Sequence, residues 1–464
     1  MADSAFLRRV SLDLVGLLPD AAAAQAFAAD TSADKRAKLI DRLLADKGAY
    51  AEHWMTFWND LLRNDEQNYI LVTRQPITPW LYKALENNKP YDEFAAELIS
   101  PPDQQSAGFV KGLLWEFSSS VSDTPPMQAA QSTAQVFQGV NLKCASCHDH
   151  FSKSWKLLDS WSLASFFTTD RLELYRCDKP TGQQAAPKFL FAGLGQLPQG
   201  AEGTAKLDLL ARMVTRPINP RFAKVIVNRL FKRLVGQGLL PDLDDLDDQR
   251  AFHPALLDWL ADDLMRHDYD LKYLLRLVAT SELYALESLP PAADVLEPFA
   301  GPRRRRLTCE QFQDGVATVT GYWPKVATMN VPIAGEQIRA WRYREPSRLT
   351  TMLGRPTRDV ICSERSEHTS VLQALELVNG QQFRDLIVAG TSKIATQPIG
   401  TSDDPRAIAD FVTWRAYCRP AAAAEVELAR DLFASEKLDA AAQRAAWEDF
   451  LWITLDSPEF VYID

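Results

Sequence analysis

The sequence lacks features that several large classes of protein require. Its apolar runs are all shorter than the roughly 18 to 20 residues that a membrane-spanning helix needs. Its first four residues, MADS, have neither the basic start nor the apolar stretch of an export signal. It contains no glycine-rich phosphate loop, no GxSxG nucleophile elbow and no HExxH zinc motif. We therefore expect no membrane span, and any export signal has been removed from this numbering.

Positive charge is scarce relative to negative charge. The chain has 51 Lys and Arg against 61 Asp and Glu, a formal net charge of −10. A surface that binds DNA or RNA needs a dense basic face to neutralise phosphates. We therefore expect no nucleic-acid partner.

Cysteine is also scarce, because six in 464 residues are few for a disulfide scaffold. Two of the six lie in one CxxCH run. The other four are Cys177, Cys309, Cys362 and Cys418. They could form two disulfides in any of three connectivities, or stay as four isolated buried thiols.

Helical periodicity is abundant, whereas convincing strand alternation is rare. Asp20 is placed to cap one helix, and the run from Thr308 to Gln311 forms a capping box before another. Asn219-Pro220 is typical of a helix start, and Gly236 of a helix end. The sequence predicts a mainly α fold.

A stretch rich in proline and glycine, residues 178–204, has little periodicity and is predicted to be a linker. It separates an N-terminal helical domain, residues 1–177, from a C-terminal mainly helical domain, residues 205–464. Within the second domain, the pattern fades between Gly321 and Pro356. That region is expected to be an ordered irregular loop or a set of short strands.

The run Cys144-Ala145-Ser146-Cys147-His148 carries the strongest chemical signal. In a helix-like turn the side chains of residues 144, 147 and 148 project to one side. The two thiols can form thioethers with the vinyl groups of a haem, and His148 can bind the iron as its proximal ligand. With 6 Cys and 6 His in the chain, chance would produce such a run about one time in a thousand. We predict one covalently attached haem c.

Two other chemistries are compatible with this run. Cys144 and Cys147 could be a thioredoxin-type dithiol or a disulfide, or could form half of a zinc site with a histidine. Haem is favoured because no second CxxC or HxxxH pair appears elsewhere in the sequence to complete a zinc site.

The ligand on the other side of the iron is not visible from spacing. His150 is too close in sequence to His148 to reach the opposite face easily. Met127, His53 and His368 are the remaining candidates, and each would need the tertiary fold to bring it there. A filled sixth position would favour electron transfer, whereas an open one would admit a substrate.

Two charged runs are weaker signals. The acidic run comprises Asp242, Asp244, Asp245, Asp247 and Asp248. It lacks the glycine and terminal glutamate of a calcium loop, so a solvated loop is the simpler interpretation. The basic run Arg303 to Arg306 is expected to pair with carboxylates of the other domain, or else to meet an anionic partner or haem propionates.

Several segments together resemble a planctomycete secreted family in which a cytochrome-c-like domain of unknown function is paired with a C-terminal domain of unknown function. The first block of similarity is residues 6–19, FLRRVSLDLVGLLP, and the sharpest is residues 135–150, QVFQGVNLKCASCHDH. The family usually has CAxCHDHP here, and Phe151 stands in place of its proline. In the second half, NPRF at 219–222, VNR at 227–229 and SPEF at 457–460 are similar to the companion domain.

The resemblance implies export, to the periplasm or the cell surface, and supports a cytochrome. It assigns no activity. Our leading hypothesis is an exported mono-haem c-type protein that exchanges electrons with a redox partner protein. One alternative is an oxidative haem enzyme that acts on an exported substrate such as carbohydrate. The other is a haem-free scaffold or binding module in a surface or multi-subunit assembly, with the CxxC pair as a disulfide or zinc site.

Overall fold

The computed structural model describes residues 1–67, 72–115, 120–191, 193–194, 202–247, 250–290, 301–333, 335, 337–366, 370–433 and 439–464. Helices account for 57% of the chain and strands for 6%, so the predicted mainly α class is confirmed. None of the helices in these ranges has an apolar stretch long enough to cross a membrane.

Helices dominate the first part of the chain, with two short antiparallel sheets of two strands each between them. The elements are α1 (Asp3–Leu14), α2 (Ala21–Ala29), α3 (Lys35–Ala45), α4 (Lys47–Leu61), β1 (Val72–Arg74), α5 (Thr78–Glu86), α6 (Tyr91–Ile99), α7 (Gly108–Lys111), β2 (Leu113–Trp115), η1 (Val121–Asp123), α8 (Pro125–Gln138), η2 (Cys144–Ser146), α9 (Leu157–Ala164), η3 (Ser165–Phe167), β3 (Leu172–Arg176), β4 (Lys179–Ala185), α10 (Thr204–Thr215), α11 (Pro220–Val235), α12 (Pro254–Arg266) and α13 (Leu271–Ala279).

The second part of the chain is again helical. Its elements are β5 (Arg305–Arg306), α14 (Cys309–Thr320), η5 (Ala340–Arg342), α15 (Arg348–Met352), α16 (Val371–Asn379), α17 (Gln381–Ile394), η6 (Pro398–Thr401), α18 (Pro405–Ala416), α19 (Ala423–Phe433), α20 (Ala440–Leu455), α21 (Pro458–Val461) and β6 (Tyr462–Ile463). β5 pairs with β6, so the chain end returns to residues 305–306.

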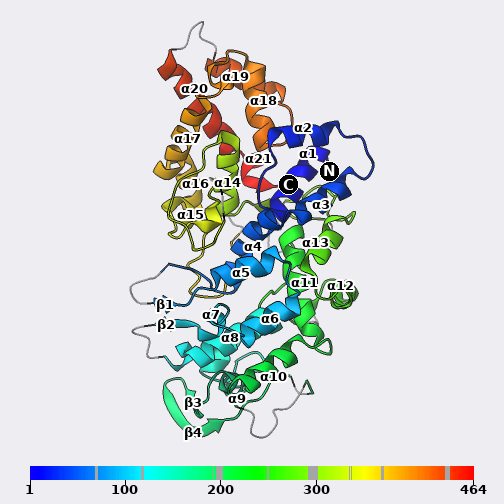
Figure 1. The fold of residues 1–464 in the computed structure, drawn as a ribbon, viewed down its shortest axis with the longest axis vertical. Helices are drawn as coiled ribbons and strands as arrows, with labels where there is room; N and C mark the ends of the chain where they lie inside the picture. The colour runs from blue at the N-terminus through cyan, green and yellow to red at the C-terminus, as the bar shows by residue number, and fades with distance from the viewer. Residues whose placement is uncertain are drawn as a thin grey trace.

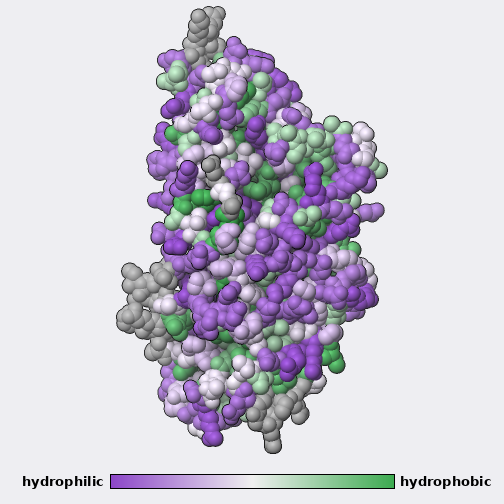
Figure 2. Space-filling model, viewed as in Figure 1, coloured by the Kyte–Doolittle hydropathy of each residue, from purple (hydrophilic) through white to green (hydrophobic). Residues whose placement is uncertain are grey.

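The elements form an elongated molecule with three levels (Figure 1). Helices α17 to α20 lie at one end, α1 to α4 in the middle, and α8 to α10 with the β3–β4 hairpin at the other end. Buried apolar side chains form two clusters, a larger one mainly from residues 6–284 and a smaller one mainly from residues 307–463. Figure 2 shows that the viewed face is mostly hydrophilic, with hydrophobic residues in small scattered groups.

Helix α1 joins the two clusters. Leu7 and Val10 belong to the larger cluster, and Leu12 to the smaller one. Three of its charged residues are buried as well, since Arg8, Arg9 and Asp13 are 5%, 1% and 3% exposed. Arg8 donates to the carbonyl oxygens of residues 416, 460 and 462, at 3.1, 2.6 and 2.6 Å. Arg9 donates to the carbonyl oxygens of residues 284, 286 and 464. The first helix therefore holds the end of the chain.

The predicted helix boundaries follow local chemistry. Asp20 accepts a hydrogen bond from the Ala23 amide at 2.7 Å and begins α2. Thr308 and Gln311 form the reciprocal capping box at the start of α14. Gly236 ends α11 with φ +79°, a left-handed conformation that a residue with a Cβ adopts at a cost.

The predicted linker, residues 178–204, begins inside the β3–β4 hairpin, because β4 occupies Lys179–Ala185. Helices α10 to α13, which follow the linker, bury their apolar faces in the same cluster as α1 to α9. This shared cluster does not separate the two proposed domains, so the division into residues 1–177 and 205–464 stays a prediction.

The region from Gly321 to Pro356 is irregular, as predicted. Its described residues contain the short helices η5 and α15 and one isolated bridge between Thr328 and Tyr343.

Asp13 provides a test of the buried charges of α1. Its carboxylate accepts two hydrogen bonds from Arg305, both 2.8 Å, and one from the Tyr284 hydroxyl at 2.6 Å. Asp13→Asn leaves Arg305 buried without its counter-charge, so we expect a loss of about 3 kcal/mol in the free energy of unfolding, measured by urea denaturation. The matched control is Asp41→Asn, which breaks the exposed pair with Arg276 and should cost about 0 to 1 kcal/mol. Equal losses in the two variants would contradict this role of Asp13.

Candidate functional site

The CxxCH run forms a single helical turn after α8. The amides of Cys147 and His148 both donate to the Cys144 carbonyl oxygen at 3.2 Å, and the Ser146 amide donates to that of Leu142 at 2.9 Å. Ala145 is fully buried, whereas Cys144 is exposed and Cys147 and His148 are half-buried. The turn therefore anchors its alanine in the core and leaves both thiols and the imidazole accessible.

The end of α8 that leads into this turn is held by α11. Arg229 donates to the carbonyl oxygens of Gln135, at 2.8 Å, and Val136. Arg221 donates to those of Gln138 and Gly139 at 2.5 and 3.1 Å. The last carbonyls of a helix have no partner within the helix, so these two arginines satisfy them and fix where α8 ends.

The closeness of α8 to its neighbours explains the glycine at its end. Gly139 has φ +55°, and a Cβ there would lie 2.5 Å from a methyl carbon of Leu246. The Gly139 carbonyl oxygen also accepts a hydrogen bond from the Leu246 amide at 2.9 Å. A side chain at this position would displace the segment that leads to the CxxCH turn.

The His148 ring is oriented by the backbone. Its Nδ1 lies 2.8 Å from the carbonyl oxygen of Asp149, which can only accept, so Nδ1 carries the proton in this contact. Nε2 is then the nitrogen with a free lone pair. This is the arrangement common in metal-binding histidines, in which one nitrogen donates to a carbonyl and the other binds the metal.

Aromatic side chains surround the turn. The Phe151 ring centroid lies 4.4 Å from that of His148, and Phe151 is 89% exposed. On the inner side, Trp161 Nε1 donates to the Ser146 carbonyl oxygen at 3.1 Å and its ring stacks on Tyr175 at 6.0 Å. The turn thus has an ordered aromatic support beneath it and an exposed aromatic ring beside the imidazole.

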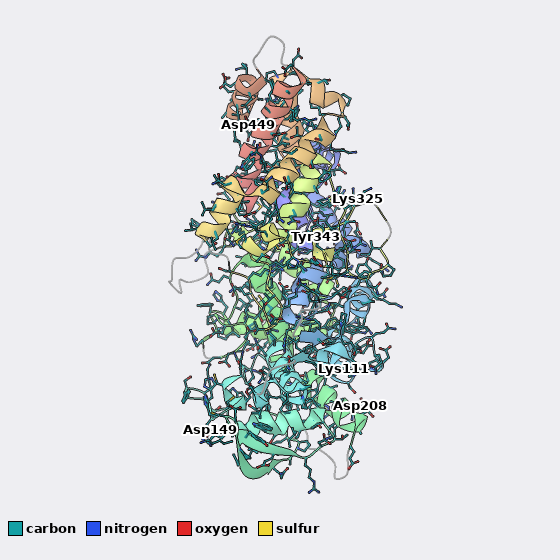
Figure 3. The ribbon with its side chains drawn as sticks, turned by 90° about the vertical axis from the view of Figure 1, so that its left-hand side faces the viewer. Lys111, Asp149, Asp208, Lys325, Tyr343 and Asp449 are labelled. Atoms are coloured by element: carbon teal, nitrogen blue, oxygen red, sulfur yellow. The ribbon has the colours of Figure 1, made fainter. Side chains whose placement is uncertain are left out.

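The site lies at the periphery of the molecule. Figure 3 labels Asp149, the residue after His148, at the edge of the end that carries the β3–β4 hairpin. The Asp149 carboxylate accepts from the Leu157 amide at 2.9 Å and lies 3.7 Å from Lys156 Nζ. The Leu157 amide is the first cause that lowers the pKa of Asp149, and the positive charges of Lys156 and Arg176 lower it further.

All six cysteines are free thiols, so neither of the two disulfides considered from the sequence is formed. Cys309 and Cys418 are buried, and Cys362 is half-buried. Cys177 is exposed at the turn of the β3–β4 hairpin, and its amide donates to the Cys147 carbonyl oxygen at 2.8 Å. A third cysteine therefore lies beside the CxxCH turn.

The proposed distal ligands are not gathered at the turn by any contact of the described residues. His53 is buried in α4, where its Nε2 lies 3.0 Å from the Asp13 carbonyl oxygen, in the middle level of the molecule. Met127 is buried near the start of α8, about 16 Å of helix rise from Gln138. His368 lies outside the described residues.

The two charged runs make ion pairs within the chain. Asp244 pairs with Arg229 at 3.1 Å, Asp245 with Lys153 at 3.2 Å, and Asp242 with Arg250 at 2.9 Å. Among the residues that the structure describes, no three His, Cys, Asp or Glu side chains are placed to hold a metal ion. In the basic run, Arg305 pairs with Asp13. Asp13 lies in the N-terminal half of the chain, so this pair is of the kind expected for the basic run.

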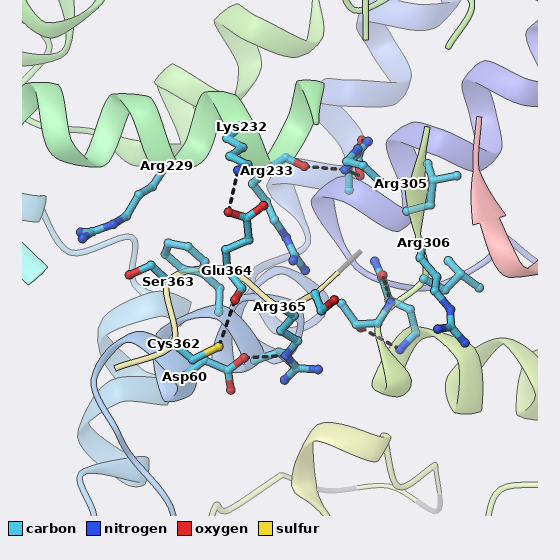
Figure 4. Close-up of a pocket in the computed structure, with 18 of the residues that line it drawn as sticks. Asp60, Arg229, Lys232, Arg233, Arg305, Arg306, Cys362, Ser363, Glu364 and Arg365 are labelled. Atoms are coloured by element: carbon cyan, nitrogen blue, oxygen red, sulfur yellow. Dashed lines mark hydrogen bonds and ion pairs between the residues drawn. The ribbon is translucent and has the colours of Figure 1, made fainter. Parts of the chain in front are cut away.

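A charged cavity that was not predicted from the sequence lies in the middle level of the molecule. It is lined by side chains from α1, α4 and α11 and from residues 305–311 and 362–366 (Figure 4). One signal was present in the sequence. Arg229 and Arg233 are four residues apart in an apolar helix, so both project from the same side of α11 and need polar partners there.

Two family sequence models match the chain, one after the other. Residues 1–171 match PSCyt2, described as a protein of unknown function (DUF1549), and residues 207–433 match PSD1, described as a protein of unknown function (DUF1553). The chain therefore carries two domains of unknown function in the expected order. No curated protein and no solved structure matches it.

The burial of the six cysteines can be tested by the reactivity of their thiols in haem-free protein. Burial raises the pKa of Cys362 to about 11 and that of Cys418 to about 12. We expect iodoacetamide at pH 8 to alkylate exposed Cys144 and Cys177 first, and Cys362 on the order of a hundredfold more slowly, because the thiolate is the nucleophile. Peptide mass spectrometry over time measures the order. In denaturant all six should react alike, and rapid alkylation of Cys309 or Cys418 in the native protein would contradict the burial described here.

Proposed function

We propose that this chain is an exported c-type cytochrome-like protein that carries one covalently attached haem and exchanges electrons with a partner protein. Cys144 and Cys147 would form the two thioethers, and His148 would bind the iron through Nε2. The observation that carries the proposal is the orientation of His148, whose Nδ1 lies 2.8 Å from a backbone carbonyl beside two accessible thiols. The bound haem would supply one-electron oxidation and reduction.

The residues of the turn fit this attachment. Side chains three and four residues apart lie on one side of a helical turn, so the turn from Cys144 to His148 supports a common side for the two thiols and the imidazole. The carbonyl of Asp149 keeps the His148 ring from rotating and fixes the tautomer that leaves Nε2 as the ligand atom. Covalent linkage would hold the cofactor at an exposed turn, where Cys144 is exposed and Cys147 and His148 are half-buried.

The position of the turn favours electron exchange with a partner. A peripheral cofactor lies close to any protein that docks on the same end of the molecule, which shortens the path for an electron. Residues 143–188 carry seven Lys or Arg and five Asp or Glu, a local excess of positive charge in a chain with net charge −10. Such a local field favours a partner with an acidic docking face.

One observation favours the haem-free alternative. The amide of Cys177 contacts the carbonyl of Cys147, so the backbones of these two residues are close enough for a disulfide to form with modest movement. A disulfide there would consume one of the thiols that haem attachment needs. The two possibilities exclude each other and differ in intact mass.

Intact mass tests the proposal directly. Protein matured in a host that attaches haem c should gain the mass of one haem, and the haem absorbance should stay with the chain after denaturation. Cys144→Ala and Cys147→Ala should each leave at most one of the two thioethers and lower the yield of attached haem, and the double variant should carry no covalently bound haem. Cys177→Ala is the matched control, since it removes a neighbouring thiol outside the motif, and it should retain attachment.

His148→Ala tests the axial ligand separately from the thioethers. We expect impaired attachment and an altered spin state, seen in the visible spectrum. A normal spectrum in this variant would rule out His148 as the ligand. A haem-free mass with two hydrogens fewer would replace the proposal with the disulfide. A low-spin spectrum that cyanide does not change would support electron transfer over the alternative of an oxidative haem enzyme.

A further inference from the structure

The cavity in the middle level has a volume of about 100 Å³ and an excess of positive charge. Three carboxylates line it, those of Asp13, Asp60 and Glu364. The cations that line it are twice as many: Arg229, Lys232, Arg233, Arg305, Arg306 and Arg365. This sign is opposite to that of the whole chain, whose net charge is −10.

The carboxylates around the cavity already have partners. Asp13 is bound by Arg305, and Glu364 lies 2.6 Å from Lys232. Asp60 is shared between Arg358 at 2.9 Å and Arg365 at 2.7 Å. Each of these three carboxylates is therefore already paired with a cation other than Arg233.

Glu310 lies next to the cavity and completes this network. Its two carboxylate oxygens accept from Arg365 at 2.7 and 3.0 Å. Burial alone would raise the pKa of Glu310, but the positive charge and hydrogen bonds of Arg365 outweigh it and lower the pKa. Glu310 is therefore an ionised and fully occupied carboxylate.

Arg233 is the exception in this network. It projects from α11 into the cavity, and no dashed line reaches its guanidinium (Figure 4). Among the described residues no hydrogen bond or ion pair involves its side chain, and only its backbone carbonyl is bound, by Arg305. Burial lowers the pKa of its guanidinium and the charges of Arg305 and Arg365 lower it further, whereas the negative charges of Asp13 and Asp60 raise it. An arginine nevertheless remains charged at neutral pH.

Arg233 is half-buried, and a charge in such a cavity without a hydrogen-bond partner favours a bound group of opposite sign. We propose that the cavity binds a small oxyanion, or the terminal phosphate, sulfate or carboxylate group of a larger ligand, and that Arg233 is its main anchor. The planar guanidinium offers donors in a fork that fits two oxygens of such a group. The Thr56 and Ser366 side chains line the same cavity and add hydroxyl groups.

Size and access agree with this ligand class. A volume of about 100 Å³ is several times the roughly 10 to 15 Å³ that one water needs by the same measure, so the cavity has room for one oxyanion group. The side chains of Lys232 and Glu364 are 19% and 43% exposed. This pair therefore lies at the solvent-facing edge of the cavity, where a ligand would enter. The inference is independent of haem attachment, because no residue of the CxxCH turn lines the cavity.

Calorimetric titration of the full chain tests the site. The probes are inorganic phosphate, sulfate and acetate, each against sodium chloride at the same ionic strength. We expect the wild type to bind one anion per chain. Arg233→Gln should bind the same anion at least about tenfold more weakly than the wild type. Tighter binding of acetate would assign a carboxylate ligand, and tighter binding of phosphate or sulfate a tetrahedral one. No binding of any of the three at millimolar concentration would overturn the proposal.

Arg212→Gln is the matched control, because it removes an exposed arginine of α10 without touching the cavity. It should bind like the wild type. Sulfate stabilises folded proteins in general, so it should raise the melting temperature of Arg233→Gln as well. The rise in melting temperature should be larger for the wild type, which also binds sulfate at the site. Without anion, Arg233→Gln should melt at the same or a higher temperature than the wild type. If this variant does not fold, Arg233→Lys keeps the charge without the fork, and an unchanged dissociation constant there would equally reject the site.

Discussion

Buried arginines with satisfied donors are the constraint on which this fold depends. A guanidinium has five donors and cannot give up its charge, so burial requires acceptors at fixed positions. Arg8 and Arg9 meet this requirement with backbone carbonyls from residues that are more than 270 positions away in sequence. The carbonyls must be in place for the arginines to be buried, so the first helix and the last strand can reach their positions only together.

The same requirement transmits order to the CxxCH turn. Arg229 and Arg221 occupy the last carbonyls of α8, and α8 sets where the following residues begin. Two of the sequence blocks that resemble the planctomycete family, residues 135–150 and residues 219–229, are thus the two sides of one contact. The turn itself is small and exposed, so its geometry depends on a helix that lies outside the segment matched by the first family model.

How much the sequence could predict depended on the range of the interactions. Caps and the CxxCH spacing act within about four residues, and the boundaries of α2, α11 and α14 followed from them. The need for polar partners at Arg229 and Arg233 was also predictable, because a charged residue on an apolar helix must be satisfied when it is buried. The carbonyl oxygens that accept from Arg229 could not be predicted, because a backbone acceptor leaves no signature in the sequence. For that reason the hydrogen bonds of Arg8 and Arg9 to the end of the chain, and the charged cavity, could be recognised only from the structure.

The cavity shows what happens where the requirement is not met within the chain. Arg229, Arg305 and Arg365 line it and are each held by carbonyls or carboxylates. Arg233 comes from the same side of α11 as Arg229, yet the three carboxylates that line the cavity are each paired with another cation. If Arg233 had only a structural role, a neutral side chain of similar size would fill the space without the cost of an unpaired charge. The retained charge is better explained by an acceptor from solution, because an anion that binds and leaves can satisfy a guanidinium that the fold itself does not.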